Sequence, residues 1–195
     1  MSFSAQKNTI SQMNNIELQR MSGIATKTQK LNRKIAHTKC QLLDTRKKTP
    51  NFRYPEKWAV MIGGGVNHRM GLFDSIMIKD NHVDFCGNMK KALEKTEHYL
   101  TRLAQPIPVI VEARNLEDVK TILKFKWVTQ ILLDNHSHED LLKAIGLIDK
   151  KLPAEASGNI TEKNIKDYAE TGVDYISMGA LTYNVKSLDL SLKAI

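Results

Sequence analysis

QILLDNHSHEDLLKAIGLIDKKLPAEASG, residues 130–158, is the stretch that decides the fold. It begins with a short apolar run at 130–133, continues into a helical pattern at 137–148, and ends in a second apolar run at 154–156. Two strands that are joined by a helix run parallel, because a parallel pair needs a crossover of about a dozen residues or more. The stretch therefore predicts a β/α unit within a parallel sheet.

The same alternation continues on both sides of this stretch. Asn115 and Ser137 stand where helix N-caps are expected, Thr161 opens the last helical pattern, and Gly172 closes it. Such alternation indicates an α/β fold built on a parallel sheet. The further predicted strands are 41–43, 75–78, 108–111 and 174–178, and the further predicted helices are 89–103, 116–125 and 161–171.

Polar or glycine residues follow each of the six predicted strands. In a closed β/α barrel the carboxyl ends of the strands converge on one mouth, where such enzymes carry their chemistry. An open doubly wound sheet would instead concentrate function at a single switch point. Six polar endings favour a TIM-barrel-like β/α barrel of parallel strands, short because it has only six. The residues that follow the strands are 44–47, 79, 112, 134, 157–158 and 179.

Cationic side chains gather at the ends of the first two predicted strands and in the segment between them. Arg and Lys bind carboxylate and phosphate through charge-assisted hydrogen bonds, and Arg does so with two parallel bonds. These residues therefore predict a pocket for a small ligand with several negative charges. This cationic cluster consists of residues that are cationic or can become so, namely Arg46, Lys47, His68, Arg69 and Lys79.

The later strands end in carboxylates and then in small residues. Glu112 and Asp134 suit ribose hydroxyls or a hydrated Mg²⁺, an ion that keeps few protein ligands. Ser157, Gly158 and Gly179 lie in the loops after the last two strands, where barrels bind phosphate and where backbone N–H groups can approach it. We therefore predict that an anionic ligand binds on one side of the barrel mouth and a phosphosugar on the other.

Composition limits the class of protein. The 195 residues suit one α/β domain, and 42% hydrophobic residues with 26% charged residues are ordinary for a globular chain. The net charge of +8 favours anionic partners, but Lys and Arg are spread along the whole chain, which argues against nucleic acid.

Cys40 and Cys86 lack metal-ligand spacing and indicate reduced thiols. Without a signal-peptide pattern or a membrane-length apolar run, we expect a cytoplasmic protein with no membrane partner.

Seven segments, in order, resemble quinolinate phosphoribosyltransferase, the nicotinate-nucleotide pyrophosphorylase of NAD biosynthesis. The resemblance runs from about residue 18 to the C-terminus, and several motifs in the right order are far more specific than any one alone. The segments are LQRMSGIAT (18–26), LDTRK (43–47), GGGVNHRMGL (63–72), IKDNH (78–82), LLDN (132–135), EASG (155–158) and VKSLD (185–189).

The resemblance implies phosphoribosyl transfer from phosphoribosyl pyrophosphate to quinolinate with decarboxylation, which gives nicotinate mononucleotide, pyrophosphate and CO₂ in the presence of Mg²⁺. It implies that the cationic cluster surrounds quinolinate or pyrophosphate, and that Glu112 and Asp134 lie near the ribose and the metal, which they hold directly or through water. It further implies that Ser157, Gly158 and Gly179 bind the ribose 5-phosphate. The implied catalytic residues are Lys47, Lys79, Glu112 and Asp134.

The chain also departs from the family pattern. The family's N-terminal sandwich domain is almost missing from it, so we expect a helical or linker segment at 1–30 and the barrel domain at 31–195. In the family's dimer that domain covers the partner's barrel mouth, and a homodimer is expected here. The residues that differ from the family pattern are Gln12, Lys48, Ile110, Asn159 and Tyr183.

Two alternatives stay open. One is a non-catalytic barrel remnant or binding module that needs another chain. The other is a related phosphoribosyltransferase for a different acid, with Ile110 and Tyr183 reflecting another ligand. For single residues, we expect Lys48 to be a solvated surface charge and Asp44 to be a structural partner of Arg46 or Lys47. His82 serves either the site or only the loop backbone.

Overall fold

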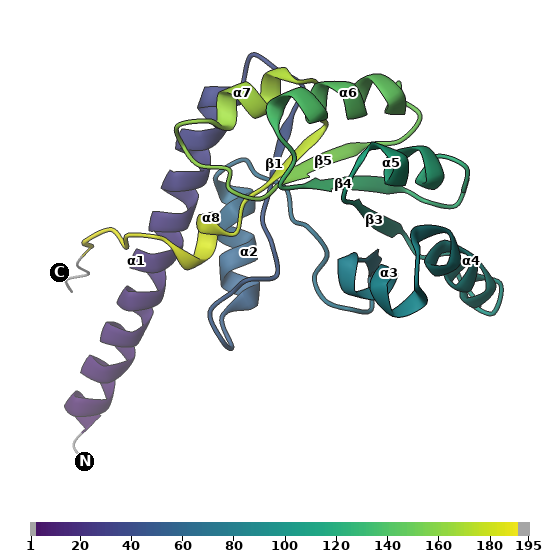
Figure 1. Ribbon diagram of the computed structural model, residues 1–195. Helices are drawn as coiled ribbons and strands as arrows, with labels where there is room; N and C mark the ends of the chain where they lie inside the picture. Colours follow the sequence, from purple (N-terminus) through teal and green to yellow (C-terminus); the bar gives the residue numbers. More distant parts are fainter. Residues whose placement is uncertain (1–2, 191–195) are drawn as a thin grey trace.

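A computed structural model describes residues 3–190 of the chain, with side chains from residue 15 onward (Figure 1). Six parallel strands form one sheet in the order β1-β6-β5-β4-β3-β2, with helices packed around it. The first and the last strand of the chain are neighbours, which is the cyclic order of a β/α barrel. The elements are α1 (Phe3–Ile35), β1 (Gln41–Leu43), α2 (Arg53–Ile62), β2 (Ile76–Ile78), α3 (Asp80–Cys86), α4 (Met89–Leu100), β3 (Val109–Ala113), α5 (Leu116–Ile122), β4 (Gln130–Asp134), α6 (His138–Ile148), β5 (Ala154–Ser157), α7 (Ile165–Glu170), β6 (Tyr175–Ser177) and α8 (Ala180–Tyr183).

The six predicted strands are all present, and two of the predicted caps are confirmed. The side chains of Asn115 and Ser137 accept hydrogen bonds from the third residue beyond them, and Gly172, with φ of +93°, follows the end of α7. The predicted start at Thr161 is wrong, because Asn164 Oδ1 accepts the Thr161 N–H at 2.7 Å and holds a turn that precedes α7. Helices α2, α3 and α8 have no counterpart in the sequence prediction.

The ring of strands is interrupted between β1 and β2. Leu43 makes a single parallel bridge with Val66, whose N–H donates to the Leu42 carbonyl at 2.8 Å. Among the described residues, β2 pairs with β3 alone. The glycine run before Val66 lets α2 end against α1, since a Cβ on Gly63 would lie 2.6 Å from Cβ of Thr28. Close packing thus accounts for this glycine.

Each strand has one face against the helices and one face inside the barrel. The helix-covered face is fully apolar, and burying each Val, Leu or Ile side chain contributes about 1.5–3 kcal/mol. The interior face carries the polar side chains of the later strands. The helix-covered residues of β3, β4 and β5 are Val109, Val111, Ala113, Ile131, Leu133, Ala154 and Ala156, and the interior ones are Ile110, Glu112, Gln130, Leu132, Asp134, Glu155 and Ser157.

Helix α1 belongs partly to the core and partly to the surface. Its second half buries Ile24, Leu31 and Ile35, whereas its first half projects away from the sheet (Figure 1). Arg20 joins it to α2, with Nη2 2.6 Å from Oε1 of the fully buried Glu56. The helix passes without a break through residues 30 and 31, so the division of the chain at that point stays a prediction. No described helix combines the length and apolar character that a membrane span needs.

Candidate active site

Lys79 and Glu112 meet at the mouth, the end of the barrel where the strands have their carboxyl termini. Lys79 directly follows β2 as the N-cap of α3, and its Nζ lies 2.8 Å from Glu112 Oε2 on β3. The Lys79 side chain is 46% exposed and that of Glu112 only 7%. The Lys79 N–H donates to His82 Nδ1 at 2.9 Å, so His82 serves the loop backbone.

Arg46 and Arg69 lie close enough at the mouth for their charges to interact. Burial lowers the pKa of Arg69, and the neighbouring charge of Arg46 lowers it further. Arg69 Nη1 donates to the Ser75 carbonyl at 3.1 Å, while Arg46 Nε is buried with no hydrogen-bond partner among the described residues. Two adjacent guanidinium groups with an unused buried donor are suited to a ligand that brings negative charge.

Lys47, the residue after Arg46, lies beside Gly179. Its Cδ would be 3.3 Å from a Cβ at position 179, where the Tyr183 ring also lies close. The Thr182 hydroxyl donates to the Lys47 carbonyl at 2.9 Å and ties the loop after β1 to α8. The structure therefore brings Lys47 next to a residue expected to bind phosphate.

His68 is turned into the barrel interior. Its Nδ1 accepts the Arg69 N–H at 2.7 Å, and its Nε2 lies 3.2 Å from Glu155 Oε2. Gln130 Nε2 donates to the same Glu155 oxygen. Sequence reasoning did not select Glu155 or Gln130. The available signal was a glutamate between two alanines within a strand, because a buried charge needs partners.

Asp44 is buried beneath the cationic cluster and corrects two predictions. Its partners are neither Arg46 nor Lys47 but Lys57 Nζ, at 2.8 and 3.0 Å, and the His68 N–H, at 2.8 Å. Lys48 is not a solvated surface charge either, since its side chain is 1% exposed and its Nζ lies 2.8 Å from Asp44 Oδ2. The chain turns after β1 so that Lys48, four residues on, points back at the carboxylate. Burial lowers the pKa of Lys48, an effect that Asp44 partly offsets.

Asp134 and the loop after β5 form a hydrogen-bonded unit. Ser157 Oγ donates to Asp134 Oδ1, and Asn135 Nδ2 donates to Oδ2 at 2.7 Å. Gly158 adopts a φ of +84°, and a Cβ there would lie 2.8 Å from the Asn135 backbone nitrogen. Asn159 Nδ2 donates to Asn135 Oδ1 at 3.0 Å. The predicted phosphate loop is therefore held in one shape by its own side chains.

The remaining departures from the family pattern occupy different places. Ile110 is buried two residues before Glu112, on the interior face of β3. Tyr183 is 61% exposed at the end of α8. Gln12 lies within α1, and its side chain is outside the described part of the chain.

No group of three or more potential metal-ligating His, Cys, Asp or Glu residues occurs in the part of the chain that the structure describes. Glu112 and Asp134 nevertheless share the interior face of the neighbouring strands β3 and β4, where Glu112 is in register with Leu132. Two carboxylates fit Mg²⁺, which keeps several waters and relies on substrate phosphates for other ligands.

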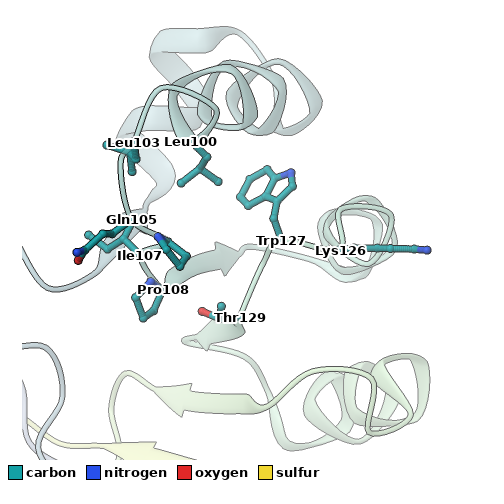
Figure 2. Close-up of a pocket in the computed structure, with 9 residues that line it drawn as sticks. Leu100, Leu103, Gln105, Ile107, Pro108, Lys126, Trp127 and Thr129 are labelled. Carbon is teal, nitrogen blue, oxygen red and sulfur yellow. The ribbon is translucent and has the colours of Figure 1, made fainter.

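A separate cavity of about 630 Å³ lies at the opposite end of the sheet (Figure 2). Its lining comes from the end of α4 and from the segments that lead into β3 and β4, with Leu100, Ile107, Pro108 and Trp127 around it. The Lys126 side chain points away from the cavity in Figure 2. The cavity is thus distinct from the charged mouth.

A six-stranded parallel β/α barrel with arginines, lysines and carboxylates at its mouth defines the class of barrel proteins that carry a charged site at the carboxyl ends of their strands. Residues 24–193 match the C-terminal domain of quinolinate phosphoribosyl transferase. The chain belongs to this family. The match confirms the resemblance of the motifs and the predicted barrel.

Relatives and solved structures agree with this assignment. The chain is 45% identical to a chloroplastic nicotinate-nucleotide pyrophosphorylase (carboxylating) of Oryza sativa subsp. japonica, and the match covers 90% of this chain and 51% of that protein. It is 46% identical to a mitochondrial quinolinate phosphoribosyltransferase of Nicotiana glauca, and this match covers 90% of this chain and 54% of that protein. The chain thus spans about half the length of the curated relatives it matches.

Among solved structures, NadC from Streptococcus pyogenes is 38% identical with a TM-score of 0.87, and the match covers 94% of this chain and 63% of that one. A nicotinate-nucleotide pyrophosphorylase from Francisella tularensis is 43% identical with a TM-score of 0.82, with 89% and 60% covered. The barrel of this chain is similar to the barrel portion of these proteins.

Proposed function

We propose that this chain transfers the phosphoribosyl group of phosphoribosyl pyrophosphate to quinolinate with decarboxylation, to give nicotinate mononucleotide, pyrophosphate and CO₂. One observation carries the proposal. Arg46 and Arg69 stand together at the mouth, and Arg46 Nε is a buried donor without a described partner. A ligand with two adjacent carboxylates would neutralise both guanidinium groups and occupy that donor.

The other mouth residues then take complementary roles. Lys79 is half exposed beside Glu112. Its ammonium group leaves the Glu112 carboxylate and binds the diacid or pyrophosphate instead. Glu112 and Asp134 stabilise the positive charge that develops on the ribose as the glycosidic bond to pyrophosphate breaks. Ser157, Gly158 and Gly179 hold the 5-phosphate, with Lys47 beside it. No covalent nucleophile is needed, because the barrel fixes the two substrates in place.

Glu112 and Asp134 would hold Mg²⁺ through its waters. When bound, the ion supplies charge neutralisation to the pyrophosphate. Both carboxylates already accept one or two hydrogen bonds, from Lys79 or from Ser157 and Asn135. A carboxylate has about four lone-pair sites, so capacity for the ion's water remains on each.

Turnover by the purified chain tests the proposal. The chain is mixed with quinolinate, phosphoribosyl pyrophosphate and Mg²⁺, and nicotinate mononucleotide is measured by chromatography. We expect product from the native chain and none from Lys79→Ala. The absence of product at high protein concentration would contradict the proposal and favour a barrel module that needs another chain.

The second candidate is a barrel module that needs another chain. It rests on the share of its relatives' length that this chain covers and on residues that differ from the family pattern. The chain spans about half the length of its curated relatives, and Tyr183 and Asn159 depart from the family pattern at the predicted phosphate side. The two candidates can be distinguished by adding the N-terminal half of a relative as a second chain. Activity that appears only with that addition would support the module.

A different acid substrate is the third candidate, and Ile110, apolar beside Glu112, is the residue that favours it. Calorimetric titration with quinolinate, nicotinate and phthalate distinguishes the acids. We expect binding of the two diacids and weaker binding of nicotinate, because one carboxylate engages only part of the cationic cluster. Tighter binding of nicotinate would support the third candidate.

We also propose a homodimer. The outer side of α2 exposes Tyr54 and Trp58 by 76% and 60%, and the neighbouring loop exposes Phe73 by 77%. Apolar side chains of this size in one region are typical of a surface that associates. A monomer in sedimentation at high concentration would contradict this proposal. A cytoplasmic location also stays a prediction, since the plant relatives include chloroplastic and mitochondrial proteins. Imaging of the tagged chain would check it.

A further inference from the structure

Glu155 is a buried carboxylate within the barrel, below the mouth. It is the second residue of β5 and is 1% exposed. One of its oxygens, Oε2, faces both Gln130 Nε2 on β4 and His68 Nε2 on the segment after α2. This side chain therefore connects two strands and the mouth loop from the inside.

The hydrogen bonds of His68 define its tautomer. Nδ1 accepts the backbone N–H of Arg69 at 2.7 Å, so it carries no proton. The ring proton is then on Nε2, which lies 3.2 Å from the Glu155 carboxylate. A protonated ring would place a hydrogen on Nδ1 against the Arg69 N–H, because both nitrogens are donors in an imidazolium. Both ring nitrogens of His68 therefore have a partner.

The backbone of His68 is fixed as well. Its N–H donates to Asp44 Oδ1 at 2.8 Å, and its carbonyl accepts from Lys57 Nζ at 2.7 Å. With the ring held by Glu155 and Arg69, four hydrogen bonds fix this residue. The next residue is Arg69, so whatever holds His68 also holds the backbone from which the Arg69 side chain extends to the Ser75 carbonyl.

We propose that Glu155, supported by Gln130, is a positioning residue that holds His68 in its neutral Nε2–H form and thereby places Arg69 in the anion pocket. His68 then contributes alignment, and the positive charge comes from its neighbours. The assignment of a diacid to the pocket rests on the proposed function, whereas the tautomer of His68 does not.

The test combines two measurements on the full chain. Long-range ¹H–¹⁵N spectra of ¹⁵N-histidine-labelled protein report each tautomer, and the His68 signal is assigned by its loss in His68→Gln. Calorimetry with phthalate, an unreactive diacid, reports the pocket. The variants are Glu155→Ala, which removes the acceptor, and Glu155→Gln, whose amide oxygen can still accept from Nε2–H. Glu97→Ala is the matched control, because Glu97 accepts from Trp127 Nε1 at 3.0 Å near the opposite end of the sheet.

We expect His68 of the native chain to show the Nε2–H tautomer at pH 7. Glu155→Ala should lose that single tautomer and bind phthalate about fivefold more weakly, the effect of losing one net hydrogen bond. Glu155→Gln should keep the tautomer and bind more tightly than Glu155→Ala, and Glu97→Ala should change neither readout. An Nδ1–H tautomer or an imidazolium in the native chain would overturn the inference, as would a Glu155→Ala variant that keeps both properties. A native chain that binds no phthalate would contradict the proposed ligand, while the tautomer would still decide the role of Glu155.

Discussion

Lys79 Nζ lies 2.8 Å from Glu112 Oε2, so an ion pair joins the carboxyl ends of β2 and β3. The lysine is 46% exposed, and an ion pair of this kind stabilises a fold by only about 0–1 kcal/mol. Its contribution to stability therefore does not account for its place at the mouth. We expect this pair to open when a ligand binds at the mouth.

Lys79→Ala should accordingly separate binding from stability. We expect the thermal midpoint to change by less than about 3 °C and the affinity for phthalate to fall about tenfold or more, because a charged hydrogen bond is lost. Lys143→Ala is the control, since Lys143 makes an exposed ion pair with Glu139 at 2.6 Å on α6. A large loss of stability in Lys79→Ala, or unchanged affinity, would contradict this explanation.

Lys48→Met should stabilise the chain at neutral pH. Burial lowers the pKa of Lys48 below its ordinary value of 10.5, so the unfolded chain holds this proton more tightly and the charged side chain opposes folding below the lowered pKa. Removing the charge should raise the free energy of unfolding by about 1 kcal/mol at pH 7. The gain should shrink as the pH rises toward 10.5, and urea unfolding at several pH values measures it.

Lys57→Met is the contrasting variant at the same carboxylate. Lys57 Nζ contacts both carboxylate oxygens of Asp44 and also donates to the His68 carbonyl, so its loss should cost about 3 kcal/mol. Equal changes in the free energy of unfolding for Lys48→Met and Lys57→Met would show that Asp44 interacts alike with both lysines.

Gly158→Ala should be much more damaging than Gly87→Ala. Both glycines have a positive φ, +84° and +91°, so backbone strain is similar at the two positions. A Cβ at position 158 would collide with Asn135, whereas at position 87 nothing lies within 4 Å. We expect Gly87→Ala to cost about 1 kcal/mol and Gly158→Ala to cost more and to weaken binding of ribose 5-phosphate. Comparable unfolding free energies would contradict the closeness of this loop to Asn135.

Cys40 should resist alkylation in the folded chain. Burial, together with the charge of Asp174, raises the pKa of its thiol to about 12, so the reactive thiolate is scarce at pH 8. Iodoacetamide followed by mass spectrometry should modify Cys86, which is partly exposed, before Cys40. In urea both should react, and fast labelling of Cys40 in the native chain would contradict its burial.

The sequence was sufficient for the strands and for the order of the mouth residues, because short apolar runs and polar endings are local signals. It was insufficient for α2, where Lys57 stands on the buried side of the helix and depends on a carboxylate thirteen residues away in the chain. The loop after β1 likewise reversed the prediction for Lys48, since a pattern of charges does not show which way a loop turns. The role of Glu155 depends on β4, β5 and the segment after α2 meeting in space, which no local pattern records.

Arg69 also lies at the opening between β1 and β2. The Ile76 N–H donates to the Pro108 carbonyl, on the side of β3. The backbone N–H and C=O groups of the neighbouring Ser75 and Met77 therefore point the other way, toward the opening between β1 and β2. Arg69 covers that side, with Nη1 on the Ser75 carbonyl and Nη2 3.6 Å from Met77 Sδ. Its loss would expose an unpaired strand edge, a template on which chains aggregate. An inactive Arg69→Ala variant would therefore have to be tested for self-association before its defect is attributed to ligand binding.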